Sequence, residues 1–367
     1  MKVMHVEAGR HLYGGALQVF YLMRELKQQH GVENLLVCPE QSDIGREAQP
    51  YAQVLPCKMG GDVDFLFSRR LIKLIKQNQP DVLHVHSRRG ADVWGAVAAK
   101  STGIASVLTR RVDNPDVRML ASFKANRYTA LAAISDGIRQ VMLNDGVAPE
   151  RVQTIRSAVD ADKFSAPRDR KALKERFGYD EQDLVIAMAA QLIDRKGHRF
   201  LLEITPQLIE KYPQVKILIL GKGPLESELK ALSKTLGLEA HVTFAGFQTD
   251  IDKILPSVDI LAHPALMEGL GVALLQTSAA GVPIVAGAAG GIPEIVRDDV
   301  NGYLTPPGDT EMLKARLMQL LGDKDLRQKL GRQGQQLAKE EFSIAQMAAK
   351  NYALYQHVLA TKKTNIN

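Results

Sequence analysis

The sequence HPALMEGLGVALLQTSAAGVPIVAGAAGGIPEIV, residues 263–296, carries the clearest fold signal in the chain. A short apolar run at 260–262 precedes it, a longer apolar segment covers 270–280, and a β-branched run follows at 284–286. This order predicts strand, helix and strand. Short apolar or β-branched runs are typical of buried strands, whereas longer apolar segments are typical of helices. A helix that joins two neighbouring strands makes them parallel, so the stretch indicates a parallel α/β sheet.

The same alternation continues on both sides of this stretch. Strands are expected at 2–7, 34–38, 82–86, 105–109, 130–134, 184–190, 216–220, 242–245, 260–262 and 284–286. Helices are expected at 16–29, 66–77, 91–101, 136–144, 171–177, 199–211, 226–236, 270–280 and 344–361. The polar, proline-containing stretch 160–170 is typical of a linker. We therefore predict an α/β protein with two Rossmann-like halves, ligands binding at the carboxyl ends of the strands in a cleft between them.

Composition and charge narrow the class of protein. The 367 residues are 45% hydrophobic and 24% charged, which excludes disordered, collagen-like and coiled-coil chains. Residues 1–170 hold 24 Lys and Arg against 18 Asp and Glu, whereas residues 171–367 hold 23 of each, so an anionic partner is expected in the first half. Two cysteines, no signal-peptide pattern and no long apolar run favour a cytoplasmic protein without a membrane span.

A glycine pair, Gly14-Gly15, follows the first expected strand and opens the next helix. Glycines at such a turn let backbone N–H groups approach a phosphate at the helix N-terminus, although an ordinary tight turn has the same sequence. The pair is not a G-x-G-x-x-G pattern, which argues against a nicotinamide-dependent dehydrogenase.

Two histidines close the expected strand at 82–86, within DVLHVH. His84 and His86 lie on one face of that strand because side chains alternate along it, and His86 at its end is a candidate to contact a ligand. The alternative is a structural role in the core. No Cys, Asp or Glu cluster accompanies the pair in the sequence, so a metal site is disfavoured.

Charged residues follow two expected strands of the second half. The sequence AAQLIDRKGH at 189–198 contains Arg195, Lys196 and Gly197, and a lysine beside a glycine at a strand–helix junction suits a diphosphate. A solvated charged turn is the alternative. Glu268 is the only Asp, Glu, Lys or Arg between Asp259 and Glu294, and an isolated carboxylate is either paired or turned toward a ligand.

The residues after Glu268 extend this candidate site. Gly269-Leu270-Gly271 would expose backbone N–H groups at the start of the helix expected at 270–280. Gln276 lies about two helical turns beyond Glu268, on roughly the same face.

Together these motifs resemble glycosyltransferase family 4, the retaining nucleotide-sugar transferases with the GT-B fold. The likeness covers nearly the whole chain and includes AISDGIRQVMLNDGVAPERVQTIRSAVDADKF, GKGPLESEL, VTFAGFQTDI, NGYLTPPGD and a late Phe342-Ser343. The resemblance implies an N-terminal acceptor domain at 1–165, a donor domain at 166–345, and a last helix at 346–367 that crosses back onto the first domain. It also implies a nucleotide-sugar substrate, with UDP-sugar the expected donor, and no metal cofactor.

The resemblance gives each matched residue an expected role. Three would act at the reaction centre: His86 at the transferred sugar, Lys196 at the diphosphate and Glu268 at the sugar hydroxyls. The donor would otherwise be held by the glycine pair, the strand-end loops and the helix after them: Gly14, Gly15, Gln191, Arg195, Gly246, Phe247, Gly269, Leu270, Gly271 and Gln276.

Two positions depart from the family pattern. Gln191 stands where the family has an arginine, so one phosphate-binding cation is missing unless Arg195 replaces it. Gln276 stands where the family has a second glutamate, although an amide still bonds ribose hydroxyls. These departures leave open a weak or inactive nucleotide-sugar-binding protein, and a sugar-nucleotide epimerase of the same fold is a further alternative. A phosphorylase is disfavoured because no pyridoxal-binding lysine motif is present.

Arginine pairs follow two expected strands of the basic half. Arg88-Arg89 and Arg110-Arg111 would lie at the rim of the cleft, with Lys124 further along. Their planar forks suit phosphate or carboxylate, which predicts an anionic acceptor. Taken with the resemblance, this implies an anionic glycan or lipid-linked acceptor of polysaccharide or lipopolysaccharide synthesis, with peripheral contact to the inner membrane. The alternative is pairing with nearby aspartates, namely Asp92, Asp113 and Asp116. Nucleic acid is disfavoured, because aromatic residues are 5% and none interleave with the arginine pairs.

Overall fold

The computed structural model describes residues 1–12, 14–86 and 90–364, and the chain forms two compact units. The first unit contains Met1–Ala158 and Ile344–Asn367, and the second contains Val159–Ser343. The division comes a few residues before the boundary expected after residue 165. The reason is that Val159 already belongs to the second unit, where its N–H bonds the carbonyl of Phe342.

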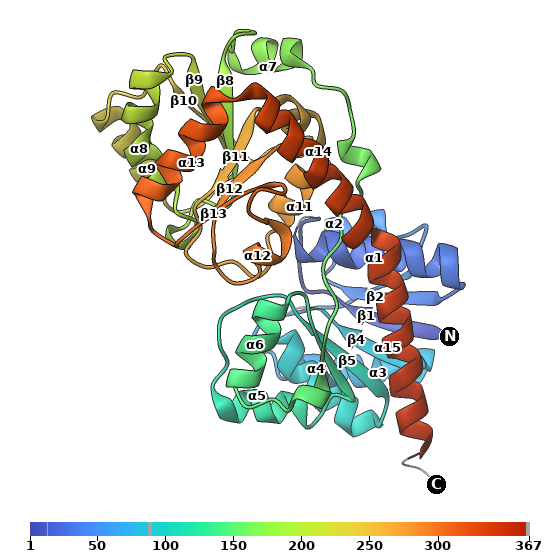
Figure 1. The fold of residues 1–367 in the computed structure, drawn as a ribbon. Coiled ribbons are helices and arrows are strands. Elements are labelled where there is room, and N and C mark those ends of the chain that lie inside the picture. Colours follow the sequence, from blue (N-terminus) through green and yellow to red (C-terminus); the bar gives the residue numbers. More distant parts are fainter. Residues whose placement is uncertain (13, 87–89, 365–367) are drawn as a thin grey trace. The chain divides into compact units, whose positions relative to one another are not determined.

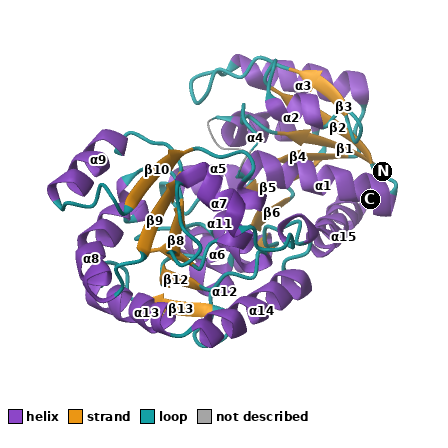
Figure 2. Cartoon of the chain, turned by 90° about the horizontal axis from the view of Figure 1, so that it is seen from above, coloured by secondary structure: helices purple, strands orange, loops and turns teal. Residues whose placement is uncertain are grey.

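The first unit is a seven-stranded parallel sheet with helices on both faces (Figures 1 and 2). The strand order is β3-β2-β1-β4-β5-β6-β7, so the order reverses between β1 and β4. The strands are β1 Lys2–Val6, β2 Glu33–Cys38, β3 Gln53–Pro56, β4 Val82–Val85, β5 Ala105–Arg110, β6 Ala130–Ala133 and β7 Val152–Thr154. In such sheets ligands bind where the strand order reverses, at the carboxyl ends of the strands.

The helices of the first unit follow its strands in chain order, and the last one returns from the far end of the sequence. They are α1 Gly15–His30, α2 Asp43–Glu47, α3 Leu66–Asn78, α4 Ala91–Thr102, α5 Arg118–Ala125, α6 Asp136–Asn144 and α15 Ile344–Thr364. Helix α15 packs against α1 and β5, and its Tyr355 and Val358 are fully buried in the same core as Leu22 and Val107. The end of the chain therefore completes the hydrophobic core of the first unit.

The second unit is a six-stranded parallel sheet of order β10-β9-β8-β11-β12-β13. Its order reverses between β8 and β11. The strands are β8 Leu184–Ala189, β9 Val215–Leu220, β10 Val242–Gly246, β11 Ile260–His263, β12 Ile284–Gly287 and β13 Gly302–Thr305. Continuous apolar runs such as the LVIAMA of β8 are buried between the helix layers, as parallel sheets require.

Eight helices, also given in chain order, accompany this second sheet. They are α7 Arg170–Phe177, α8 His198–Lys211, α9 Glu226–Thr235, α10 Ile251–Ile254, α11 Val272–Ala279, α12 Ile292–Ile295, α13 Thr310–Gly322 and α14 Lys324–Glu341. Asp309 and Asp323 cap α13 and α14 by accepting hydrogen bonds from backbone N–H groups, which fixes where these helices begin. None of the described helices is long and apolar enough to cross a membrane.

All the expected strands and helices are present, with ends that differ by at most three residues. Strands β3, β7 and β13 were not expected, and each lies at the edge of its sheet. Each is only three or four residues long, because edge strands bury one side less and are often short. The helix expected from residue 270 begins at Val272, after the left-handed Gly271.

Candidate functional site

In the second unit, a lysine, a glutamate and a histidine meet where the strand order reverses. Lys196 ends the short helical turn after β8, His263 is the last residue of β11, and Glu268 lies in the loop between β11 and α11. The Nζ of Lys196 lies 2.5 Å from the Oε2 of Glu268, and the Nε2 of His263 lies 3.0 Å from the same oxygen. Lys196 and Glu268, both expected from the sequence, are thus in direct contact.

Glycines and backbone bonds hold the two loops together. Gly197 has a φ of 75°, and a Cβ there would lie 2.1 Å from the carbonyl oxygen of Pro264, so only glycine fits. The N–H of Leu266 donates to the carbonyl of Arg195 at 2.8 Å. The glycine in the RKG sequence therefore lets the loop after β8 pack against the loop after β11, which brings Lys196 to Glu268.

Glu268 is held as a carboxylate. Burial raises its pKa, but the hydrogen bond and charge of His263 and then those of Lys196 outweigh burial, and the pKa falls to about 2. At neutral pH Glu268 is therefore an acceptor of hydrogen bonds and not a general acid. His198, at the start of α8, is driven the other way: burial, His263 and Lys196 lower its pKa to about 4.

Four more of the expected donor residues lie in the loop before α11 and in that helix. Gly269 donates its N–H to Glu268, Leu270 is buried, and Gly271 precedes α11 as its N-cap with a φ of 97°. Gln276 is half-buried, and its side chain has no hydrogen bond within the described part of the chain. The start of α11 therefore presents N–H groups beside an ionised carboxylate.

Four further expected donor residues lie after β8 or at the end of β10. Gln191 is exposed just after β8, and Arg195 is half-buried on the turn that ends at Lys196. Gly246 ends β10 with a φ of 69°, and the aromatic ring of Phe247 is 47% exposed after it. An exposed phenyl ring at the carboxyl edge is available to stack on a flat ligand.

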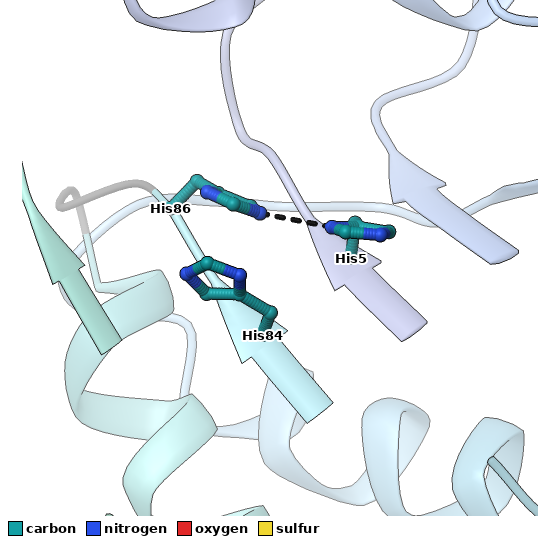
Figure 3. Close-up of side chains that lie close together, drawn as sticks. All are labelled: His5, His84 and His86. Carbon is teal, nitrogen blue, oxygen red and sulfur yellow. Dashed lines mark hydrogen bonds between the residues drawn. The ribbon is translucent and has the colours of Figure 1, made fainter. Parts of the chain in front are cut away.

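In the first unit, three buried histidines cluster beside the place where its strand order reverses. His5 lies in β1, His84 in β4 and His86 directly after β4 (Figure 3). The Nδ1 of His5 lies 3.0 Å from the Nε2 of His86, and the ring centroids of His84 and His86 are 3.7 Å apart. The sequence pointed to His84 and His86 but missed His5. The available signal was the position of His5 in the neighbouring strand, in register with His84.

These histidines are neutral at physiological pH. Burial lowers the pKa of His5 to about 4, against a smaller opposing effect of its hydrogen bond to Asn34. Burial lowers the pKa of His84 and His86 well below its usual value, and the neighbouring histidines and Arg111 lower it further. His86 is only 2% exposed, and its Nδ1 faces the Nη2 of Arg111.

Arg111 connects this cluster to the glycine pair. Its Nη2 lies 3.5 Å from the Nδ1 of His86, and its Cδ lies 3.2 Å from where a Cβ of Gly15 would be. Gly14 has a φ of 53° before α1, and Gly15 is the first residue of that helix. The Nε of Arg111 is buried and has no hydrogen-bond acceptor among the described residues. Burial lowers the pKa of Arg111 to about 10, so it stays charged at neutral pH.

The expectation that Arg110 is free to bind an anion is wrong. Its guanidinium is buried: Nη1 bonds Asp145 at 2.9 Å and Asp116 at 3.4 Å, Nε bonds the carbonyl of Val112, and Nη2 bonds the carbonyl of Asn114. Lys124 is also buried and pairs with Asp92 and Asp116. Pairing with aspartates, the alternative reading, describes both residues, but in the core and not on the surface. Arg88 and Arg89 lie outside the described residues.

Comparison with protein-family models assigns both halves of the chain. Residues 169–337 match the model "Glycosyl transferases group 1", and residues 13–163 match "Glycosyltransferase Family 4". EpsD of Bacillus subtilis, itself a proposed glycosyltransferase, is 32% identical over 301 residues, which cover 76% of this chain and 78% of EpsD. The chain belongs to glycosyltransferase family 4.

Two further relatives fit this assignment. A UDP-Gal:α-D-GlcNAc-diphosphoundecaprenol α-1,3-galactosyltransferase of Escherichia coli is 26% identical over 272 residues, 70% of each chain. The structure of Anabaena HepE in complex with UDP has the same fold, with a TM-score of 0.83 at 19% identity over 97% of this glycosyltransferase and all of HepE. The two halves are therefore those of the GT-B fold. The comparisons do not favour a binding protein or an epimerase, because EpsD and the E. coli relative are both named as transferases.

Proposed function

We propose that this glycosyltransferase is a retaining enzyme that moves a hexosyl or N-acetylhexosaminyl unit from a UDP-sugar to an anionic acceptor. The acceptor would be a glycan or a lipid-linked phosphate of bacterial cell-surface polysaccharide or lipopolysaccharide synthesis. The observation that carries the proposal is the contact of Lys196 with an ionised Glu268, beside the start of α11, where the second sheet reverses its strand order. The choice of uridine is supported by HepE, which binds UDP, and by the E. coli relative, whose named donor is UDP-Gal.

The second unit would hold the donor. Lys196 supplies the positive charge that the diphosphate needs, and the free N–H groups at the start of α11 add the partial positive charge of a helix N-terminus. Glu268 accepts hydrogen bonds from the sugar hydroxyls, and Phe247 stacks on the base. Lys196 contacts Glu268 in this structure, so donor binding would draw its ammonium group toward the diphosphate.

The reaction needs no nucleophile from the protein. The bond between the sugar C1 and the diphosphate oxygen breaks, and its electron pair stays on that oxygen. The acceptor hydroxyl bonds to C1 from the same face, and its proton passes to the departing diphosphate oxygen. Lys196 and the helix N-terminus stabilise the charge that develops there. A single hydrogen-bond donor in comparable oxyanion sites lowers the activation free energy by about 3–4 kcal/mol. A resident metal ion is not part of this scheme.

The first unit would hold the acceptor. Arg111 is its charged candidate, because its Nε has no acceptor among the described residues and its side chain lies beside Gly15 and His86. A guanidinium is well suited to phosphate, and the named acceptor of the E. coli relative carries a diphosphoundecaprenol group. A lipid-linked acceptor would hold the enzyme at the cytoplasmic face of the membrane without a membrane span.

The test is nucleotide release from a panel of UDP-sugars and GDP-mannose, with and without a diphosphate-lipid-linked sugar and its uncharged analogue. We expect UDP release that depends on the charged acceptor, and an α-linked product by NMR. Glu268→Gln should lower this activity, whereas Glu228→Gln, an exposed glutamate of α9, should not. A β-linked product would contradict retention. Release without any acceptor would indicate an epimerase or hydrolase, and binding without release would indicate a binding protein.

A further inference from the structure

We infer that Asn34 and His5 fix the tautomer of His86, so that His86 carries its proton on Nε2 and presents a bare Nδ1 toward Arg111. Asn34 and His5 would then be positioning residues for the candidate sugar contact. The inference deepens the proposed function and rests on it only for the role of His86 at the sugar. The tautomer itself can be measured without any assay of transfer.

Asn34 in β2 has a side-chain amide with a fixed orientation. Its Nδ2 donates to the carbonyl oxygens of Met23 at 2.9 Å and Tyr51 at 3.1 Å. The opposite orientation of the amide would point its oxygen at two carbonyl oxygens, so the two acceptors fix the orientation. The Oδ1 of Asn34 therefore faces the Nε2 of His5, 3.2 Å away, and it can only accept a hydrogen bond there.

The constraint passes through His5 to His86. The Nε2 of His5 must carry a proton to donate to Asn34, and a neutral imidazole has only one such proton, so the Nδ1 of His5 is bare. That Nδ1 lies 3.0 Å from the Nε2 of His86, which must therefore be the donor (dashed line in Figure 3). His86 is neutral as well, which leaves its Nδ1 as an acceptor. Arg111, a group that only donates, lies on that side at 3.5 Å, in agreement with this assignment.

The same three histidines could instead be ligands of a metal ion, because one nitrogen of each lies within 4.8 Å of the others. Their contacts oppose this reading. Both nitrogens of His84 are hydrogen-bonded, Nδ1 to the hydroxyl of Tyr355 at 2.6 Å and Nε2 to that of Thr109 at 2.7 Å. A metal would have to replace one of these bonds and the bond between His5 and His86, beside the charge of Arg111. The group that could hold the metal includes no carboxylate among the described residues.

The assigned tautomer decides what His86 can do. A bare Nδ1 accepts a hydrogen bond from a sugar hydroxyl or from Arg111, but it cannot donate one. The opposite tautomer would place an N–H against the N–H groups of Arg111 and leave the Nδ1 of His5 without a donor. His5 is fully buried and lies in register with His84, so its strand position holds it in this arrangement.

The experiment is ¹⁵N NMR of the full chain labelled at histidine, with His86 assigned by its loss in His86→Gln. We expect the Nε2-protonated tautomer of His86 in the wild type. His5→Leu removes the acceptor and should shift the tautomer ratio toward Nδ1–H by about five-fold, whereas His5→Gln retains a side-chain carbonyl and should shift it less. His11→Gln, an exposed histidine outside the cluster, is the matched control and should leave the signal unchanged.

Two results would overturn the inference: a wild-type His86 protonated on Nδ1, or purified protein with one equivalent of zinc bound by the three histidines. Both measurements use the wild type, so a folding defect in His5→Leu leaves the inference testable. As a second readout, His5→Leu should lower kcat for transfer about ten-fold, and His5→Gln should recover part of it. If no donor supports transfer while the NMR result holds, the proposed function fails and the tautomer assignment stands.

Discussion

The two units bring their candidate residues to equivalent places but use different chemistry there. In each sheet the residues lie near the carboxyl ends of the two strands between which the order reverses, β1 and β4 in the first unit and β8 and β11 in the second. The second unit places opposite charges in contact, Lys196 with Glu268. The first unit buries neutral histidines joined by hydrogen bonds, with the cation Arg111 at their edge. One site is suited to a charged diphosphate, and the other to hydroxyls and one anionic group.

This difference changes what the net charge of the first half means. Its excess of positive residues predicts an anionic partner, yet Arg110 and Lys124 are buried and bonded to Asp92, Asp116 and Asp145. These cations stabilise the fold and are not available to a ligand. The position of each cation, and not the net charge of a half, therefore decides what a unit offers to a ligand, since Lys196 acts in a half with no net charge at all.

The largest expected effect separates the two neighbouring arginines. Arg110→Ala should lower the free energy of unfolding by about 3–5 kcal/mol, because it leaves buried carboxylates without their partner. Arg111→Ala should leave stability nearly unchanged and raise the acceptor KM about ten-fold, with little effect on the donor KM. Urea unfolding and steady-state kinetics measure the two effects. Equal effects of both substitutions on stability would remove the distinction between structural and ligand-binding cations.

The next effect tests the charge contact of the second unit. Lys196→Ala should lower kcat by about 10²–10³, because the developing charge on the diphosphate loses its cation. Lys196→Arg should keep part of the activity, and Arg199→Ala, which removes an exposed cation of α8 a few residues away, should change kcat little. Steady-state kinetics with the best UDP-sugar measure this. A loss of less than three-fold in Lys196→Ala would show that the helix N-termini alone stabilise the leaving group.

The units should also respond differently to acid. The folded-state pKa of His5 is about 4, below its ordinary 6.5, so the unfolded chain binds more protons as the pH falls through 6.5. The first unit should therefore lose stability between pH 6.5 and 4, by about 1.4 kcal/mol per pH unit for each such histidine. Glu268 has a folded-state pKa of about 2, below its ordinary 4.5. Its contribution to the stability of the second unit is therefore kept until the pH falls below about 4.5, and it is lost as the pH falls toward 2.

One tryptophan makes this measurable. Trp94 lies in α4 of the first unit and is the only tryptophan in the chain, so its fluorescence reports urea unfolding of that unit. We expect the urea concentration at the midpoint of unfolding, measured by Trp94 fluorescence, to decrease as the pH is lowered from 7.5 to 5.5. His198→Asn removes a histidine of the second unit with a pKa of about 4, and it should not alter the pH dependence at Trp94. A midpoint that is constant over this range would mean that the histidine cluster is not held neutral.

The sequence was sufficient for the architecture because the central strands and the helices carry strong periodic signals. Runs such as VKILIL and the helices between them predicted both parallel sheets, and three short edge strands were missed. An edge strand such as VQT is too short and too polar to stand out, and only its neighbour in the sheet identifies it.

The site was predicted unevenly, since spacing along the chain does not report what packs across a sheet. Lys196 and Glu268 follow different strands, and the order of motifs placed both at one edge. His5 and Asn34 were missed because each looks like an ordinary strand residue until β1 lies between β2 and β4. Arg110 was misjudged for the same reason: its partner Asp145 follows α6, and no local pattern connects the two.

The smallest effect tests whether the charge of the donor site can be increased. Gln191 is exposed just after β8, where the family pattern has an arginine. Gln191→Arg should lower the UDP-sugar Kd about three-fold at low salt, because an exposed cation contributes only about 0.2–1 kcal/mol, and the gain should disappear at high salt. Gln182→Arg places the same charge before the opposite end of β8 and should leave the Kd unchanged. Isothermal titration with both variants distinguishes a local contact with the diphosphate from a general effect of net charge. Equal gains would indicate that the second unit attracts its ligand through overall charge, as the first unit was expected to do.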